Sequence, residues 1–312
     1  MLSVIFPGQG SQSVGMARDL HEKYKLVQDI FKEADETLNS SFSNLIFNGP
    51  NEILDETENT QPAIFIVGYS IFQLLKKEFG INLNKAKYFA GHSLGEYTAL
   101  ACAGSLSFSE TLKLLKARGK AMQSAVPKGE GGMVAVLGTE VNLIEKILQE
   151  NIGLYKCFVA NDNSKGQVVV SGKIKDLNLF MEDLKKNSIK NIKLPVSAPF
   201  HCNLMNKATL LMKNEIEKYK FTDPTNTLIS NVTSKEINKA DDLKKLLIMQ
   251  IESRVRWKES IEYMIKNGIL RFIEIGPGKV LSGLVKRINK NVEIYSINSK
   301  DDINKIKEND KF

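Results

Sequence analysis

The stretch Gly91-His92-Ser93-Leu94-Gly95 is a G-x-S-x-G pentapeptide placed between a strand pattern and a helix pattern. The apolar residues 88–90 before it predict a short buried strand, and the small residues of 96–103 after it predict a helix. A sharp strand-to-helix turn needs glycine because its backbone is crowded. The stretch therefore predicts a nucleophile elbow, with the Ser93 hydroxyl at a helix N-terminus whose free N–H groups can stabilise an oxyanion. A glycine-rich turn that merely contains a serine is the alternative.

A serine nucleophile needs a base, and the chain has only three histidines. His21 lies in a polar stretch of an early helix and is expected to be solvated. His92 sits inside the elbow, where its side chain should project away from the nucleophile. His201 follows a strand end in a proline-punctuated loop, a common place for catalytic groups, and is the predicted partner of Ser93. A structural His201 would leave the elbow without a base, and the adjacent Cys202 is a weaker candidate nucleophile.

The bulk composition is that of a soluble globular enzyme, with 312 residues, 42% of them hydrophobic and 25% charged. No apolar run approaches the roughly 18–20 residues that span a bilayer. The first residues lack the basic and apolar regions of a signal peptide, so we expect none. The three cysteines are scattered without metal-ligand spacing. We therefore expect a cytoplasmic protein with no membrane association, no disulfide framework and no metal site.

The formal net charge is +7, and lysines spread along the chain supply most of the positive charge. Such a basic surface favours an acidic protein partner or a phosphorylated cofactor. Nucleic acid is not expected as a partner, because no basic run is interleaved with aromatic residues.

Strand and helix patterns alternate over most of the chain, which indicates an α/β fold with a mostly parallel sheet covered on both faces. Residues 128–196 differ, because their order is strand, helix, strand, strand, helix, strand, a βαββαβ ferredoxin-like unit. We predict strands at 133–137, 157–160, 167–171 and 191–196 and helices at 141–150 and 175–186. This subdomain is inserted into a core formed by residues 1–127 and 197–312.

The core segments carry further patterns. Thr60 is a plausible N-cap for a helix that has Pro62 in its first turn and ends at Gly80. Other strands are predicted at 4–6, 227–232, 271–275 and 293–297, and other helices near 109–125, 203–219, 241–251 and 257–267. The polar tail after Asn298 is expected to fray or to form a short surface helix.

Two more features suggest a site. The turn Gly8-Gln9-Gly10 follows the first strand and lacks the ending of a phosphate-binding loop, so it is either a plain turn or a source of a backbone N–H toward the active site. Arg118 stands on an otherwise apolar helix face in an arginine-poor chain. Its fork would suit a bidentate bond to a carboxylate, although an arginine that snorkels to the surface is an equal alternative.

Taken together, these residues resemble the malonyl-CoA:acyl-carrier-protein transacylases of bacterial type II fatty acid synthesis, and also the acyltransferase domains of polyketide synthases. The resemblance covers about residues 4–298. It rests on Phe6-Pro7-Gly8-Gln9-Gly10-Ser11-Gln12, Thr60-Gln61-Pro62-Ala63, Ala90-Gly91-His92-Ser93-Leu94-Gly95-Glu96, Arg118-Gly119 with Met122-Gln123, Gly166-Gln167-Val168-Val169, His201, Gln250 and Ile275-Gly276-Pro277-Gly278.

The resemblance implies an α/β-hydrolase-like core with an inserted ferredoxin-like lobe. It implies that Ser93 carries the malonyl ester, that His201 is general base and then acid, and that Arg118 binds the malonyl carboxylate. The backbone N–H groups of Gln9 and Leu94 would form the oxyanion hole. Gln250 would belong to the segment that orients His201 through a main-chain carbonyl.

The implied activity is that of an acyl-carrier-protein S-malonyltransferase with a ping-pong mechanism. Its partners would be malonyl-CoA and a transiently bound acidic acyl carrier protein, with no cofactor, and the protein would be a monomer. Phe200, beside His201, should crowd a methyl branch and so favour malonyl over methylmalonyl.

Two other functions remain as alternatives. A serine hydrolase would place an acidic triad member between serine and histidine, and Asp162 and Asp183 are the candidates there. A non-catalytic binder of carrier protein or nucleic acid would use the positive charge and would leave the elbow unexplained.

Overall fold

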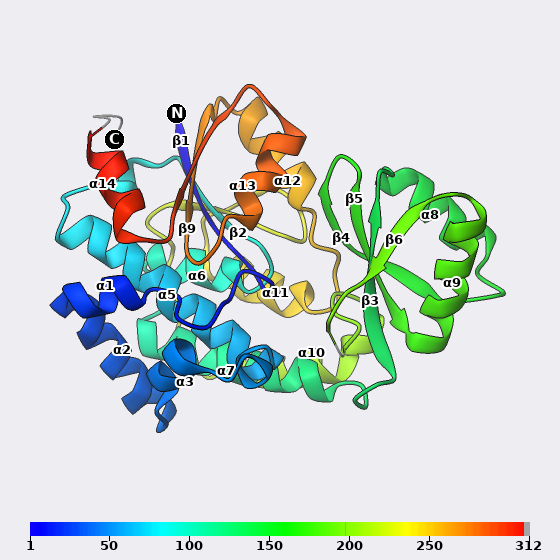
Figure 1. Ribbon diagram of the computed structural model, residues 1–312, viewed down its shortest axis with the longest axis horizontal. Coiled ribbons are helices and arrows are strands. Elements are labelled where there is room, and N and C mark those ends of the chain that lie inside the picture. Colours follow the sequence, from blue (N-terminus) through cyan, green and yellow to red (C-terminus); the bar gives the residue numbers. More distant parts are fainter. Residues whose placement is uncertain (197, 309–312) are drawn as a thin grey trace.

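The computed structural model describes residues 1–196 and 198–308, and it folds into a larger and a smaller lobe (Figure 1). The larger lobe contains a six-stranded sheet in the order β10-β9-β1-β2-β7-β8. Neighbouring strands are parallel except β7 and β8, which are antiparallel. The strands are β1 (Leu2–Phe6), β2 (Tyr88–Gly91), β7 (Thr227–Ile229), β8 (Glu236–Ile237), β9 (Arg271–Ile275) and β10 (Glu293–Ile297).

Helices cover both faces of this sheet (Figure 1). Along β1 the side chains alternate, so that Val4 and Phe6 enter one hydrophobic core while Ile5 enters the other. The first core is closed by α5 (Thr57–Lys77), α6 (Gly95–Cys102) and α7 (Phe108–Ser124), and the second by α12 (Trp257–Lys266) and α13 (Val280–Ile288). The remaining helices of this lobe are α1 (Arg18–Lys23), α2 (Lys25–Leu38), α3 (Phe42–Asn48), α4 (Asn51–Leu54), α10 (Asn206–Glu217), α11 (Ala240–Gln250) and α14 (Lys300–Glu308).

The smaller lobe confirms the predicted βαββαβ order. Its antiparallel sheet has the order β4-β5-β3-β6, formed by β3 (Gly131–Leu137), β4 (Cys157–Ser164), β5 (Gln167–Lys173) and β6 (Lys190–Lys193). One face is covered by α8 (Val141–Glu150) and α9 (Ile174–Lys186). On the other face Met133, Ala135 and Val169 join the core of the larger lobe. The boundaries at 128 and 196 stay a prediction.

A β-bridge with two backbone hydrogen bonds joins the lobes. Asn161 of β4 pairs with Val255, which precedes α12, as an isolated parallel bridge. Asp162 N–H donates to Val255 O over 3.0 Å, and Val255 N–H donates to Ala160 O over 2.8 Å. The smaller sheet is thereby held against the segment that follows α11.

Several predicted boundaries were wrong. The helix predicted from Thr60 begins at Thr57, because the Thr60 hydroxyl donates to Leu54 O instead of capping. Pro62 consequently lies inside α5. The strand expected at 227–232 ends at Ile229 and turns back through β8, which was not predicted. The strand expected at 191–196 ends at Lys193.

The tail forms a helix through Glu308, which is one of the two predicted outcomes, but α14 is more than a surface helix. Ile303 and Ile306 are buried in the first core. The last four residues of the expected tail, 309–312, lie outside the described residues.

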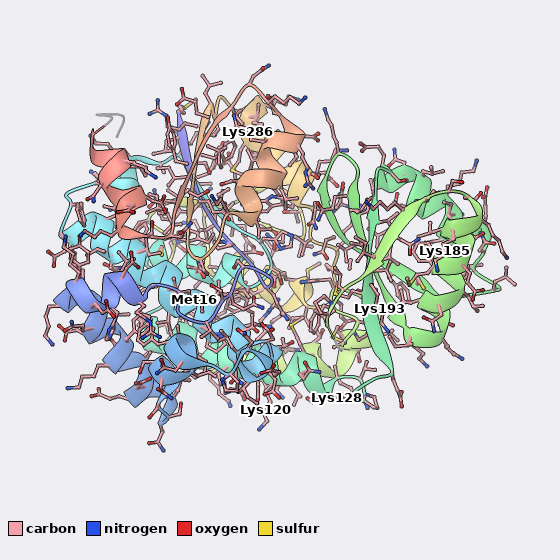
Figure 2. All side chains as sticks on the ribbon, in the orientation of Figure 1. Met16, Lys120, Lys128, Lys185, Lys193 and Lys286 are labelled. Carbon is pink, nitrogen blue, oxygen red and sulfur yellow. The ribbon has the colours of Figure 1, made fainter. Side chains whose placement is uncertain are left out.

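The surface and the helices bear on the charge and membrane predictions. The lysines labelled in Figure 2, namely Lys120, Lys128, Lys185, Lys193 and Lys286, are distributed over both lobes. Positive charge is thus spread widely, in keeping with the spacing of lysines along the chain. Within the described ranges, none of the helices combines the length and the apolar character that crossing a bilayer requires.

Candidate active site

The elbow is built as the pentapeptide predicts, between β2 and α6. A side chain at Gly91 would place its Cβ 1.9 Å from the carbonyl group of Gly95, and one at Gly95 would meet Phe6 O at 2.3 Å. Both distances are impossible for real atoms, so glycine is required on each side of the nucleophile. The turn brings Ser93 to the carboxyl end of β2, at the edge of the sheet where parallel α/β folds place their sites.

Ser93 has a left-handed backbone, with φ of 54°, which is strained for a residue other than glycine. The side chain of Asn231 holds this conformation. Its Oδ1 accepts from Ser93 N–H over 2.7 Å, and its Nδ2 donates to Gly91 O over 2.7 Å. One asparagine therefore fixes both sides of the turn.

Ser93 and His201 meet although they are far apart in the chain. Ser93 Oγ lies 2.8 Å from His201 Nε2, and His201 Nδ1 lies 2.9 Å from the backbone carbonyl of Gln250. A carbonyl can only accept, so Nδ1 carries the proton, which leaves the lone pair of Nε2 to accept from the serine hydroxyl. This arrangement orients the imidazole as a base without a carboxylate.

The surroundings keep His201 neutral. Burial and the positive charge of Arg118 lower the pKa of His201 to about 3, against a backbone contact with Gln250 that raises it. At neutral pH the ring is therefore unprotonated, the state that a general base requires.

Arg118 does not snorkel to the surface, because it is fully buried within α7. Its Nη2 donates to Ser93 Oγ over 3.2 Å and to Gln250 Oε1 over 2.8 Å, and its Nη1 donates to Gln61 Oε1 over 2.8 Å. Its Nε has no partner among the described residues. None of these acceptors is a carboxylate, so a buried cation stands beside the nucleophile with only neutral groups bound to it.

These groups line a cavity of about 210 Å³ between the lobes. Gln9 and Leu94 line it together with Ser93. The smaller lobe contributes polar Asn161, Asn163 and Gln167. The apolar part of the wall contains Phe200 and the side chains of Met122, Met133, Leu194, Val196, Val280, Leu281 and Leu284.

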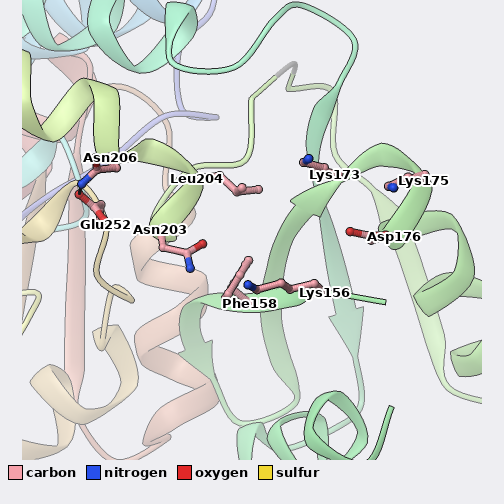
Figure 3. Close-up of a pocket in the computed structure, with 9 residues that line it drawn as sticks. All are labelled: Lys156, Phe158, Lys173, Lys175, Asp176, Asn203, Leu204, Asn206 and Glu252. Carbon is pink, nitrogen blue, oxygen red and sulfur yellow. Dashed lines mark hydrogen bonds between the residues drawn. The ribbon is translucent and has the colours of Figure 1, made fainter. Parts of the chain in front are cut away.

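A larger, more open groove of about 500 Å³ lies beside Asn203 and Leu204, which follow His201 in the chain (Figure 3). Figure 3 shows Lys156, Lys173 and Lys175 on the side of the smaller lobe, facing Asn206 and Glu252, which are joined by a 3.2 Å hydrogen bond. The residues described in its lining include neither serine nor histidine. The groove therefore has no nucleophile and base pair, and the smaller cavity is the candidate active site.

The other two histidines have different surroundings. His92 Nε2 lies 2.8 Å from Asn163 Oδ1, and its ring packs edge-on against Trp257, so it does not contact the Ser93 hydroxyl. His21 was expected to be solvated, but it is half-buried against Phe31 and Phe47, and burial lowers its pKa.

Neither acidic residue proposed for a hydrolase triad reaches His201. Asp183 accepts from the Tyr155 hydroxyl over 2.8 Å within the smaller lobe. Asp162 lies at the β-bridge between the lobes, where burial raises its pKa to about 6. In the part of the chain described, the acceptor for His201 Nδ1 is the carbonyl of Gln250.

Besides the polar residues that the smaller lobe contributes, sequence reasoning missed three polar residues that contact the elbow, Arg118 or Gln250: Gln61, Glu96 and Asn231. Gln61 and Asn231 carry amides, which have no distinctive sequence signal. Glu96 had one, because it is an acidic residue in a helix of small apolar residues directly after the elbow. It is 1% exposed, and its Oε2 accepts from Gln250 Nε2 over 2.7 Å.

Within the part of the chain that the structure describes, no group of three or more histidine, cysteine, aspartate or glutamate side chains is arranged to hold a metal ion.

The chain is similar to known proteins over nearly its whole length. Residues 4–306 match the family model described as the acyl transferase domain. The chain is 40% identical over 306 residues to a malonyl CoA-acyl carrier protein transacylase of Bacillus subtilis (strain 168), covering 97% of this chain and 95% of that protein. It is 37% identical over 295 residues to the protein of the same name from Escherichia coli (strain K12), covering 94% of each.

Solved structures agree with the sequence matches. A crystal structure of an acyl-carrier-protein-S-malonyltransferase from Bartonella henselae has 39% identity and a TM-score of 0.95, covering 98% of both chains. A type II polyketide acyl carrier protein in complex with its malonyl-transacylase provides a second match, with 34% identity, a TM-score of 0.94 and 99% coverage of both chains.

Proposed function

This chain belongs to the acyl transferase domain family, and we propose that it transfers a malonyl group from malonyl-CoA to the phosphopantetheine thiol of an acyl carrier protein. One observation carries the proposal: the Ser93 hydroxyl contacts both the ring of His201 and the guanidinium of Arg118. A nucleophile, its base and a buried cation without an acidic partner suit an acyl group that brings its own carboxylate. The relatives that match over nearly their full length are named malonyl CoA-acyl carrier protein transacylases, which supports the same substrate.

In the first half-reaction Ser93 Oγ attacks the thioester carbonyl while its proton passes to His201 Nε2. The carbonyl oxygen becomes an oxyanion, for which the N–H groups of Gln9 and Leu94 are the proposed donors. The carbon–sulfur bond then breaks, and the CoA sulfur leaves with the proton from His201. In the second half-reaction the pantetheine thiol attacks the malonyl ester by the same steps, and Ser93 recovers its proton.

Arg118 supplies the specificity in this proposal. A malonyl carboxylate that enters a partly dry cavity loses its hydration, which is costly unless a cation meets it. A guanidinium can offer two parallel donors to such a carboxylate, and the bonds of Arg118 to Gln61 and Gln250 fix the orientation of its guanidinium. Phe200 lines the cavity, and we propose that its ring crowds a methyl branch and so favours malonyl over methylmalonyl.

The remaining parts of the proposal concern the protein's setting. The chemistry described uses only side chains and backbone N–H groups, so we propose that it needs neither a metal nor a redox cofactor. We expect the protein to work as a cytoplasmic monomer that meets its carrier transiently. The formal charge of +7 would favour an acidic carrier, whose encounter with the enzyme weakens as salt is added.

Intact-mass measurement tests the proposal. Wild-type protein mixed with malonyl-CoA should gain one malonyl mass on the peptide that contains Ser93, and should lose it when carrier protein with a free pantetheine thiol is added. Ser93→Ala should gain none. Malonyl transfer by Ser93→Ala at the wild-type rate would disprove the assignment, and rapid steady-state release of malonate without carrier would identify a hydrolase instead.

A further inference from the structure

Glu96 is a buried carboxylate that belongs to the site without touching the reacting atoms. It is the second residue of α6, immediately behind the elbow, and it is 1% exposed. Oε2 accepts from Gln250 Nε2 over 2.7 Å and from the backbone N–H of Asn231 over 3.3 Å. Oε1 has no hydrogen-bond partner in the described chain. A buried carboxylate oxygen without a partner is costly when charged and much less so when protonated.

One amide connects this carboxylate to Arg118. Gln250 receives the guanidinium at Oε1 over 2.8 Å and donates from Nε2 to Glu96, so the side chain of Gln250 bridges the cation and the anion. Arg118 has no carboxylate among its own acceptors, and of the two ionisable groups that raise its pKa against burial, Tyr97 and Glu96, only Glu96 is a carboxylate. Glu96 therefore balances the charge of Arg118 through the side chain of Gln250, without contacting the guanidinium itself. Nη2 of the guanidinium is left facing Ser93.

A substrate carboxylate disturbs this balance. When it pairs with Arg118, two carboxylates share one buried guanidinium, and the site gains one uncompensated negative charge. Two carboxylates close together cannot both stay ionised at low cost, so the one with the poorer partners takes up a proton. Glu96, with its partnerless oxygen, is that group.

We propose that Glu96 takes up one proton from solvent when the carboxylate of a malonyl group binds Arg118, and releases it when the malonyl group leaves. The inference rests on the proposed function, since it concerns the charge of that substrate. The proton binds to Oε1, where no donor competes for the position. No other bond forms or breaks at Glu96, so it is a positioning and charge-balancing residue and not a catalytic one.

The surroundings support titration near neutrality. Burial raises the pKa of Glu96 to about 7, while Gln250, Asn231 and Arg118 hold it lower than burial alone would. Tyr97, on the same helix, is neutral because burial raises its pKa to about 12. His201, which also responds to Arg118, is neutral with a pKa lowered to about 3. The elements β1, β2, α5 and α7, which also pack on α6, contribute no ionisable group that acts on Glu96 besides Arg118, and α11 contributes the neutral amide of Gln250.

Calorimetry measures this proton directly. Ser93→Ala protein, which cannot be acylated, is titrated at pH 8 with malonyl-CoA in two buffers of different ionisation enthalpy, and the difference in heat gives the protons taken up. We expect the binding of malonyl-CoA to take up at least roughly half a proton more than the binding of acetyl-CoA. The comparison with acetyl-CoA cancels any protons taken up by the CoA phosphates. Above pH 7 the affinity for malonyl-CoA should fall, by up to about tenfold per pH unit, while that for acetyl-CoA should not.

Three further variants in the Ser93→Ala background identify the acceptor. Glu96→Gln should abolish the excess proton and make malonyl-CoA affinity independent of pH, and Glu96→Asp should restore both. Glu274→Gln is the matched control, since Glu274 is also fully buried with a raised pKa but binds the start of α13. It should leave the excess proton in place. Retained acetyl-CoA binding shows that each variant is folded.

The inference and the proposed function fail in different ways. Absence of a malonyl mass on wild-type Ser93 would refute the function. With that mass present, equal proton uptake for the two thioesters, or an excess proton that survives Glu96→Gln, would overturn the role of Glu96 and leave the function standing.

Discussion

Arg118 donates from Nη2 directly to the Ser93 hydroxyl over 3.2 Å, so the buried cation and the nucleophile are in contact. This contact fixes how far from the reacting carbonyl a substrate carboxylate can lie. In a malonyl group one carbon separates the two carboxyl carbons, which suits a cation that adjoins the attacking oxygen. The guanidinium also acts on the imidazole, because its positive charge adds to the effect of burial and lowers the pKa of His201 further.

Arg118→Ala should reduce the malonyl specificity constant by about 2–4 kcal/mol, because the substrate carboxylate would lose its partner in a buried site. Acetyl transfer should be spared or improved, since acetyl carries no charge and an unpaired buried guanidinium is itself unfavourable. The measurement is the ratio of malonyl to acetyl transfer in the variant and in wild type. Equal losses for both substrates would mean that Arg118 is structural.

Succinyl-CoA should be a poor substrate. Its additional methylene moves the carboxylate away from the carbonyl, so a succinyl group that reaches Ser93 must fold back or displace the guanidinium from Gln61 and Gln250. We expect acylation at least about tenfold slower than with malonyl-CoA, an effect typical of one misplaced methylene. Single-turnover acylation followed by intact mass measures it, and comparable rates for the two thioesters would show that the carboxylate is bound elsewhere.

Phe200→Ser should admit a methyl branch. Phe200 is 6% exposed and lines the cavity beside His201, while its backbone carbonyl accepts from Ser171 Oγ and would keep that bond. The ratio of methylmalonyl to malonyl acylation should rise by roughly tenfold, in line with about 1–3 kcal/mol for one methyl group in a tight pocket. Direct competition between the two thioesters gives this ratio. If it does not change, Phe200 does not set the branch preference.

The pH profile of acylation should reflect the depressed pKa of His201. Because that pKa is lowered to about 3, the ring stays neutral, and able to accept the serine proton, down to pH values well below its ordinary 6.5. Acetyl-CoA acylation should therefore show no loss near pH 6.5 from protonation of the base. In Arg118→Ala the positive charge is gone, so the pKa of His201 should rise and an acidic limb should move toward neutrality. Identical limbs in the two proteins would contradict this coupling.

Asn231→Ala should weaken both the elbow and the enzyme. The variant leaves Ser93 N–H and Gly91 O without their partner, which should cost about 1–3 kcal/mol in the free energy of unfolding and should slow acylation. Asn226→Ala is the matched control, because the Asn226 side chain also makes two bonds to backbone groups, in its case as donor to two carbonyls, and does not line the cavity. Denaturant unfolding with acylation kinetics separates the two effects. Equal acylation rates in both variants would show that Asn231 does not shape the nucleophile.

The sequence predicts most reliably what is decided locally or by scarcity. The elbow is a local matter, since steric limits at Gly91 and Gly95 force glycine there. His201 could be selected because only three histidines exist, and Arg118 because arginine is rare in this chain. The order of strands and helices followed from periodicity, which each element carries in its own residues.

What could not be predicted depends on contacts between distant segments. Asn231 follows β7 and Gln61 lies in α5. Nothing in their neighbouring residues indicates that Asn231 bonds to both sides of the elbow or that Gln61 accepts from Arg118. Thr60 looked like a helix cap because threonine is a common N-cap and Pro62 would then lie in the first turn, but the Thr60 hydroxyl donates to the carbonyl of Leu54 instead. The brief strand β8 is too short for any periodicity to be visible.

The β-bridge between β4 and Val255, with its two backbone bonds, affects how substrates can reach Ser93. Val255 is five residues past Gln250, whose carbonyl aims His201, so the seam between the lobes and the alignment of the base lie on one short piece of chain. A clamshell motion that parted the lobes would break these two backbone bonds and disturb the imidazole. We therefore expect the lobes to stay together, and a long, thin pantetheine arm to enter the cavity between them with the acyl group at its tip.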